Sequence, residues 1–329
     1  MGEAGDAVHT VAARQQALSS AFSRLTSREI ALTCSRMKLG FVGLGSMGFA
    51  MAESLLAQGH QLFVYNRARE KAQPLHEAGA RIAATPAEVA RETEVVISMV
   101  ADDAALEAVT FGAAGILAEL RPSAVHVSCS TISVALSERL AAVHAEAGLG
   151  YVAAPVFGRP EAAVAKKLWV LAAGRAADVE RALPVLEALG RGVTRLGETA
   201  SLANVVKLTG NVFIASMIES LGEAFALTRK AGVPPELFLS LFTNVFGQGS
   251  LILENYARQV AKDEYEPASF KAKLGLKDLR LALSAADQLA VPLPTASLIH
   301  DQLLSALATG QGEHDWAVIA RIAAKRAGL

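Results

Sequence analysis

Cysteine is scarce in this chain. Only Cys34 and Cys129 occur among 329 residues, and their separation fits no disulfide framework, metal site or redox motif. We therefore expect a reduced compartment and predict a cytoplasmic protein. The seven histidines are scattered, without an HExxH motif or paired Cys/His spacing, so we predict no protein-bound metal.

An excess of charge of either sign is also lacking. The chain has 31 basic and 32 acidic residues, a net charge of −1, so no basic field attracts nucleic acid or an anionic membrane. Charged residues interrupt the most apolar stretches before they reach the roughly 20 residues of a membrane helix, so we expect no membrane span. With 52% hydrophobic residues, the chain can bury a large core, and its length favours two domains.

Residues 1–36 do not resemble part of a fold. The segment is rich in alanine, with arginines and serines, and it has no apolar core typical of a signal peptide. Glu3 and Asp6 disfavour an organelle presequence. We predict a poorly ordered extension, or a native chain that begins at Met37; the intact mass of the native protein distinguishes the two.

From residue 38 onward, short apolar runs alternate with helical patterns. The expected strands are 39–42, 61–65, 95–100, 124–128, 151–154 and 168–172. Alternating strands and helices predict an α/β domain at 37–198, with a mostly parallel sheet covered on both faces. Beyond about residue 199 only helical patterns remain, which predicts an all-helical domain at 199–329. Its expected helices are 203–230, 235–244, 251–262, 274–289 and 295–308.

A glycine-rich turn follows the first expected strand. It fits the pattern G-x-G-x-x-G and opens a helix, which is the context of a dinucleotide-binding turn. The glycines permit the tight turn, the approach of backbone to pyrophosphate and close packing, while the helix N-terminus stabilises phosphate charge. The alternative is a glycine-rich turn of another α/β domain. The residues are Gly43, Leu44, Gly45, Ser46, Met47 and Gly48.

The end of the second expected strand predicts which cofactor binds. Sites that prefer NAD(H) usually place an acidic residue there, but this chain has Asn66 and Arg67. Asn66 does not repel a 2′-phosphate, and Arg67 offers it a planar fork of donors, with Arg69 or Lys71 adding charge. We therefore expect NADP(H) to be preferred, with NAD(H) as the alternative cofactor. The other interpretation of Arg67 is that it begins a solvated helix.

Four motifs in this order resemble those of the β-hydroxyacid dehydrogenase family, over nearly the whole chain from Lys38. The first is the glycine turn. The second, Ser130-Thr131-Ile132-Ser133, is similar to the family's S-T-I-x-P. The third, Lys207-Leu208-Thr209-Gly210-Asn211, is similar to K-L-x-x-N, and the fourth, Lys277-Asp278-Leu279 after Phe270, to F-x6-K-D-L.

The resemblance implies a Rossmann-like domain followed by a helical domain, acting on a small-molecule substrate. It implies that Lys207 is the catalytic acid/base and that Ser130 and Asn211 help to hold substrate. It also implies that Thr131, Lys277 and the loop containing Val100 and Ala101 contact the cofactor. Members of the family commonly form dimers or tetramers through the helical domain, so we expect a homodimer or homotetramer.

The residues at the third motif fit carbonyl reduction. A lysine ammonium bonded to the substrate oxygen stabilises its charge and donates the proton, provided that burial or a neighbouring cation such as Lys277 lowers its pKa. Asn211 lies one helical turn beyond Lys207, on the same face, and its amide can orient the lysine or the substrate. Each residue also has a structural alternative: a surface charge for Lys207, a helix–helix bond for Asn211 and a helix cap for Ser130.

One segment departs from the family pattern. Where the family has D-A-P-V-S-G-G, residues 153–159 read AAPVFGR, so that Gly158 is kept while Phe157 and Arg159 are new. We expect a reshaped substrate pocket, in which Gly158 and Arg159 contact substrate. Arg159 either pairs with an acidic substrate or turns outward to solvent.

Two further functions remain open at this point. Similar folds reduce imines, and others bind the cofactor without catalysis. Both groups generally lack the lysine at this helix position, so Lys207 favours a dehydrogenase or reductase.

Overall fold

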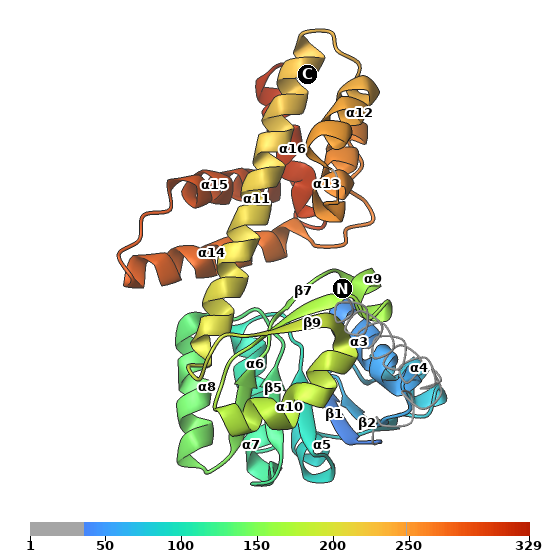
Figure 1. The fold of residues 1–329 in the computed structure, drawn as a ribbon, viewed down its shortest axis with the longest axis vertical. Coiled ribbons are helices and arrows are strands. Elements are labelled where there is room, and N and C mark those ends of the chain that lie inside the picture. Colours follow the sequence, from blue (N-terminus) through green and yellow to red (C-terminus); the bar gives the residue numbers. More distant parts are fainter. Residues whose placement is uncertain (1–35, 248) are drawn as a thin grey trace, which may run out of the picture. The chain divides into compact units, whose positions relative to one another are not determined.

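The computed structural model describes residues 36–247 and 249–329 (Figure 1). The chain divides into two units, Met1–Met37 and Lys38–Leu329, and the second contains every element described below. The predicted extension at 1–36 lies outside the described residues, apart from Arg36.

A six-stranded parallel sheet forms the first half of the described chain. Its order is β3-β2-β1-β4-β5-β6, and every neighbouring pair is parallel, which confirms the predicted α/β fold. The order reverses between β1 and β4, where parallel sheets open a ligand crevice beyond the carboxyl ends of their strands. The strands are β1 (Lys38–Val42), β2 (Gln61–Tyr65), β3 (Arg81–Ile82), β4 (Val95–Ser98), β5 (Val125–Ser128) and β6 (Gly150–Ala153).

Helices connect the strands and cover the sheet. Every residue of β4, β5 and β6 is buried, as expected for strands with both faces covered. The connecting elements are α3 (Ser46–Ala57), η1 (Arg69–Ala72), α4 (Gln73–Glu77), α5 (Pro86–Glu92), α6 (Asp103–Phe111), α7 (Ile116–Glu119) and α8 (Val134–Glu146).

A second, three-stranded sheet corrects one expectation. The strand expected at 168–172 forms, but it pairs outside the parallel sheet, antiparallel to β7 and parallel to β9. Neither partner has a strong sequence signal, because β7 has two residues and β9 contains two glycines. The elements are β7 (Val156–Phe157), α9 (Pro160–Val164), β8 (Leu168–Ala172), α10 (Ala176–Leu189) and β9 (Gly190–Arg195).

Helix α11 (Ser201–Lys230) is the central element of the helical half. Buried residues recur along it at spacings of three and four, the period of a helix face, and it ends before Gly232, whose φ of +85° suits glycine. The helix packs on α13, α14, α15 and α16. Around it lie α12 (Pro235–Phe246), α13 (Leu251–Lys262), α14 (Ala272–Gln288), α15 (Pro294–Ala308), η2 (Trp316–Val318) and α16 (Ile319–Arg326). The five expected helices are confirmed, and α16 is an addition.

The same helix corrects the expectation about apolar length. By length and composition alone α11 is sufficient to cross a membrane, because its few charges leave a mean hydropathy of 1.3 over 18 residues. A buried core helix satisfies the same criterion. In α11 44% of that window is buried: Ile218, Leu221 and Phe225 lie in the core, whereas Phe213 and Leu227 are exposed.

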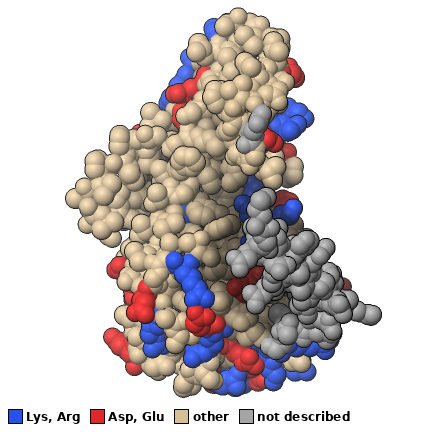
Figure 2. Space-filling view, viewed as in Figure 1, with Lys and Arg blue, Asp and Glu red and all other residues tan. Residues whose placement is uncertain are grey.

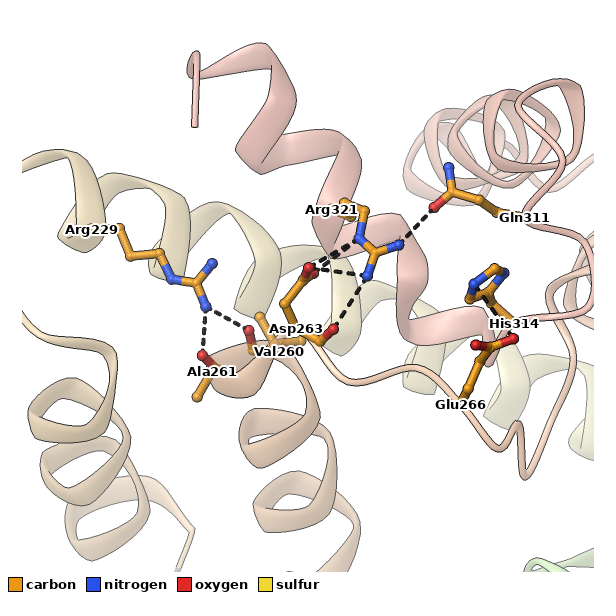
Figure 3. A network of polar contacts seen from close by, with 8 residues as sticks. All are labelled: Arg229, Val260, Ala261, Asp263, Glu266, Gln311, His314 and Arg321. Atoms are coloured by element: carbon orange, nitrogen blue, oxygen red, sulfur yellow. Dashed lines mark hydrogen bonds and ion pairs between the residues drawn. The ribbon is translucent and has the colours of Figure 1, made fainter.

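Two arginines hold the C-terminal end of α13 in place (Figure 3). Arg229 of α11 donates to the carbonyl oxygens of Val260 and Ala261, at 2.9 and 2.6 Å. These carbonyls belong to the last turn of α13, where a helix leaves acceptors unsatisfied. Arg321 of α16 binds the carboxylate of Asp263 at 3.0 Å. The contacts fix the end of α13 against both α11 and α16.

A chain of buried polar side chains runs from β4 through the neighbouring β5 to α8. Ser98 Oγ lies 2.9 Å from His126 Nε2, and His126 Nδ1 lies 3.1 Å from His144 Nε2. His144 Nδ1 lies 2.7 Å from the carbonyl oxygen of Leu140, which only accepts, so that Nδ1 donates and both imidazoles form the chain as neutral rings. Burial lowers the pKa of His144 to about 4 and that of His126 well below its usual value.

Candidate active site

The glycine turn between β1 and α3 has the geometry of a dinucleotide-binding loop. Gly43 has φ of +99°, and a Cβ there would lie 2.3 Å from the carbonyl oxygen of Met99. A Cβ on Gly48 would lie 2.0 Å from the carbonyl oxygen of Gly43. Both positions therefore require glycine for the fold itself.

Gly45 differs from the other two glycines, because a Cβ there would meet nothing within 4 Å. It is the N-cap of α3, and the first turn, with Ser46 and Met47, contains no acidic residue and no side-chain cap. The backbone N–H groups of this turn are therefore left for an anion, which the helix dipole also favours. Open space before an uncapped helix N-terminus fits the pyrophosphate of a dinucleotide.

Asn66 supports this turn. Its Oδ1 accepts from the backbone N–H of Leu44 at 2.9 Å, and its Nδ2 donates to the carbonyl oxygen of Ala68 at 2.9 Å. The sequence alone did not indicate this bracing role. Arg67, the next residue, is exposed, and its side chain has no ion-pair partner among residues 36–247 and 249–329. Its predicted contact with a 2′-phosphate stays a prediction.

The loops after β4 and β5 lie at the same edge of the sheet as the glycine turn. Val100 donates its backbone N–H to Ser130 Oγ at 2.8 Å, and Ser130 is fully buried. Ser130 therefore ties the two loops together, while Ala101 is exposed beside them. The structure brings these predicted cofactor and substrate residues together, although the contacts with ligand that we expected of them stay predictions.

Lys207 begins a buried polar network between the sheet and the helical half. Lys207 Nζ donates to Asn211 Oδ1 at 3.0 Å, and Asn211 Nδ2 donates to Asp278 Oδ2 at 2.6 Å. Asp278 also pairs with Lys277 Nζ at 2.9 Å, and Lys277 donates to the carbonyl oxygen of Thr131 at 2.6 Å. Asn211 thus contacts the lysine, and it also makes the helix–helix bond that was its structural alternative, because Asp278 belongs to α14.

Burial sets the proton affinity of Lys207. The residue is 9% exposed, and desolvation lowers its pKa to about 8. Asp278 opposes this decrease in pKa, while Lys277 adds to it as a neighbouring positive charge. A lysine with this pKa exchanges a proton near neutral pH far more readily than a solvated one.

The segment 157–159 lies against the helical half. The ring of Phe157 has its centroid 4.3 Å from Lys207 Nζ. Gly158 has φ of +136°, which glycine adopts without strain. Arg159 does not turn outward: its guanidinium stacks on Tyr256, 4.6 Å from the ring centroid, and lies 3.8 Å from the buried carboxylate of Asp315. Whether Gly158 and Arg159 contact substrate stays a prediction.

Two family models match consecutive parts of the chain. The NAD binding domain of 6-phosphogluconate dehydrogenase matches residues 38–197. The NAD-binding domain of NADP-dependent 3-hydroxyisobutyrate dehydrogenase matches residues 202–323. The chain belongs to the β-hydroxyacid dehydrogenase family. It is accordingly an NAD(P)-dependent oxidoreductase.

Individual members of the family align over almost their full length. The uncharacterized oxidoreductase YfjR of Bacillus subtilis is 41% identical over 283 residues, which are 86% of this chain and 98% of that one. The 3-sulfolactaldehyde reductase of Escherichia coli is 32% identical over 282 residues, 85% of this chain and 94% of the other. A crystal structure of 3-hydroxyisobutyrate dehydrogenase from Salmonella typhimurium superposes with a TM-score of 0.78 at 29% identity, covering 87% of this chain and 99% of that one.

Sequence reasoning missed two residues of this dehydrogenase site. Asp278 was part of the fourth motif, but it had no role until its contacts with Asn211 and Lys277 were seen. An acidic residue directly after a lysine, at a buried helix position, was the available signal. Phe157 was noted only as a departure, because its contact with Lys207 joins residues that are distant in the chain.

Proposed function

We propose that this oxidoreductase uses NADP(H) to reduce a small aldehyde or keto acid, or to oxidise the corresponding 3-hydroxy acid, with Lys207 as the acid/base. The observation that carries the proposal is the buried Lys207 ammonium, held by Asn211 and with a pKa of about 8. When bound, the nicotinamide supplies or accepts the hydride.

In this proposal Lys207 donates or accepts the proton of the reaction. In reduction its ammonium hydrogen-bonds to the carbonyl oxygen, stabilises the negative charge that develops there and donates the proton. In oxidation the neutral amine accepts the proton of the alcohol. An ammonium has three donors, and Asn211 Oδ1 uses one of them, so that two remain for substrate and neighbouring groups.

Asp278 fixes the orientation of the Asn211 amide. A carboxylate only accepts, so the amide nitrogen of Asn211 must face Asp278 and the amide oxygen must face Lys207. The negative charge of Asp278 also keeps the pKa of Lys207 from falling further. Asp278 is thus a positioning residue that acts through Asn211 and through its charge.

The glycine turn and two further loops would hold the cofactor. We propose that the glycine turn and the N–H groups of α3 bind the pyrophosphate, and that the loops containing Val100, Ala101 and Thr131 flank the nicotinamide half. Preference for NADP(H) is supported by the absence of an acidic residue at the end of β2 and by the exposed guanidinium of Arg67.

A substrate panel tests the reaction. NADPH consumption is measured with glyoxylate, succinic semialdehyde, tartronate semialdehyde and a cyclic imine. We expect turnover of at least one aldehyde or keto acid. In Lys207→Ala the turnover should decrease by a factor of about 10² or more, while the NADPH affinity stays nearly unchanged. Turnover of the imine alone would refute the proposal.

Arg67→Ala tests the cofactor preference. The ratio of kcat/KM with NADPH to that with NADH should decrease, because the variant loses a charge-assisted contact with the 2′-phosphate. Lys71→Ala, which removes a nearby exposed charge, is the matched control and should change the ratio less. An unaltered ratio in the Arg67 variant would exclude the assigned role.

We further propose that the protein forms a homodimer or homotetramer through its helical half. No residue of α12 is buried, although the helix is strongly apolar, and on the face shown in Figure 2 this half is mostly uncharged, with charged residues at its margins. Light scattering of Leu241→Asp should show dissociation to a monomer. The exposed apolar side chains include Leu237, Leu241, Val245, Phe246, Leu251 and Ile252.

We also propose a cytoplasmic location, which cell fractionation tests.

A further inference from the structure

Phe157 lies directly against the amine of Lys207. The residue ends β7, where it pairs with Trp169 of β8, so the second sheet holds its backbone. Its ring centroid lies 4.3 Å from Lys207 Nζ, well within the range of a cation–π contact. The amine of Lys207 is thus held from two sides, by Asn211 Oδ1 and by the face of an aromatic ring.

Gly210 provides the space that this ring occupies. It lies three residues beyond Lys207 on α11, inside a helix, where alanine is normally preferred. A Cβ on Gly210 would lie 2.3 Å from Phe157 Cζ and 2.6 Å from Cε1. The helix therefore lacks a side chain at the position where the ring packs, and the ring and the gap fit each other.

The burial of Lys207 strengthens its cation–π contact with Phe157. Lys207 is 9% exposed, so that little water competes with the ring for the ammonium. Asp278, the acidic group that favours the charged form, is bonded to Asn211 and paired with Lys277. The ring of Phe157 favours the ammonium without bringing a second negative charge next to the site of hydride transfer.

We propose that Phe157 is a positioning residue of the reaction: its ring, packed into the gap at Gly210, orients the Lys207 ammonium and stabilises it over the neutral amine. The inference rests on the proposed role of Lys207 as the acid/base. Loss of the ring then shifts the proton equilibrium of Lys207 toward the neutral amine and leaves less of the acid available for reduction.

The test is Phe157→Leu, which keeps an apolar side chain at the position while removing the ring. In the wild type and in the variant, the pKa of Lys207 is obtained from the pH dependence of the acetylation rate of this lysine. Peptide mass spectrometry of the intact, folded protein's digest monitors the acetylation. We expect a decrease of about one pH unit. In the reductive direction the alkaline limb of kcat should shift to lower pH by the same amount.

Gly210→Ala tests the same contact from the other side. The added methyl group displaces the ring, so this variant should also lower the pKa of Lys207. In the Phe157→Leu background, where the space is free, the alanine should have little further effect. Phe213→Leu is the matched control, because Phe213 is on the same helix but 72% exposed, and it should leave the pKa unchanged.

The outcomes separate this inference from the proposed function. An unchanged Lys207 pKa in Phe157→Leu, or equal effects of Gly210→Ala with and without the ring, overturns the role of Phe157. The acetylation measurement does not depend on turnover. If Lys207→Ala retains full activity while Phe157→Leu lowers the pKa, the acid/base assignment fails and the ring contact stands.

Discussion

The buried histidines of the parallel sheet predict a loss of stability in mild acid. His126 and His144 are fully buried and hydrogen-bonded as neutral rings, so protonation of either disrupts the chain from Ser98 to the carbonyl of Leu140. In the unfolded chain a histidine takes up its proton near pH 6.5, whereas folding lowers the pKa of His144 to about 4.

The sign and size of the effect follow from this difference. A lowered folded-state pKa means that the unfolded state binds more protons between pH 6.5 and 4, so the free energy of unfolding decreases as the pH falls through that window. At 1.36 kcal/mol per pH unit, His144 alone removes about 3 kcal/mol by pH 4. The lowered pKa of His126 adds to the loss.

Urea unfolding at pH 8, 7, 6 and 5, followed by circular dichroism, measures the decrease. His144→Gln should flatten the pH dependence between pH 6.5 and 5, although it also lowers the stability at pH 8 because hydrogen bonds of His144 are lost. His76→Gln, at an exposed position, should keep the wild-type pH dependence. A His144 variant with the wild-type slope would refute the reasoning.

Three further predictions concern the active site. In the wild type, kcat for reduction should fall above about pH 8 as Lys207 loses its proton, while kcat for oxidation should rise through the same pH. Stopped-flow kinetics in both directions checks this. A kcat for reduction that rises above pH 8, or a kcat for oxidation that falls, would contradict it. In Asp278→Asn the fall of kcat for reduction and the rise of kcat for oxidation should both move to lower pH, because the carboxylate that favours the Lys207 ammonium is lost. Gly45→Ala should keep the wild-type melting temperature but weaken NADPH binding in calorimetry, whereas Gly48→Ala should lower the melting temperature, because its Cβ meets the carbonyl oxygen of Gly43.

The periodic parts of the fold were predictable from the sequence. Strand β4 is a short, mostly apolar run, and the glycine turn after β1 identifies the edge of the sheet where a dinucleotide is expected. The membership of β8 in a second sheet was not predictable, because its partners are short or rich in glycine and strand pairing is decided by tertiary packing. The sequence pattern alone gave no period or motif for either partner.

The sequence motifs singled out individual residues of the candidate site, but they did not predict the contacts between those residues. The motifs identified Lys207 and Lys277 as residues to examine, and their place on helices followed from periodicity. The contacts of Asp278 with Asn211, and of Phe157 with Lys207, join residues far apart in the chain, and no spacing rule reports such pairs. Asn66 shows the same limit, since a residue read as a cofactor determinant also braces the glycine turn.

The neighbouring pair Lys277 and Asp278 has a consequence for protein engineering. Lys277 binds the loop after β5 through Thr131, and Asp278 holds α11 through Asn211, so one dipeptide of α14 aligns both partners. A chimera that exchanges the nucleotide-binding half between family members must therefore preserve the backbone position of Thr131 that receives this lysine. Matching the connecting peptide before α11 is not sufficient to keep Lys277 in contact with Thr131 and Asp278 in contact with Asn211.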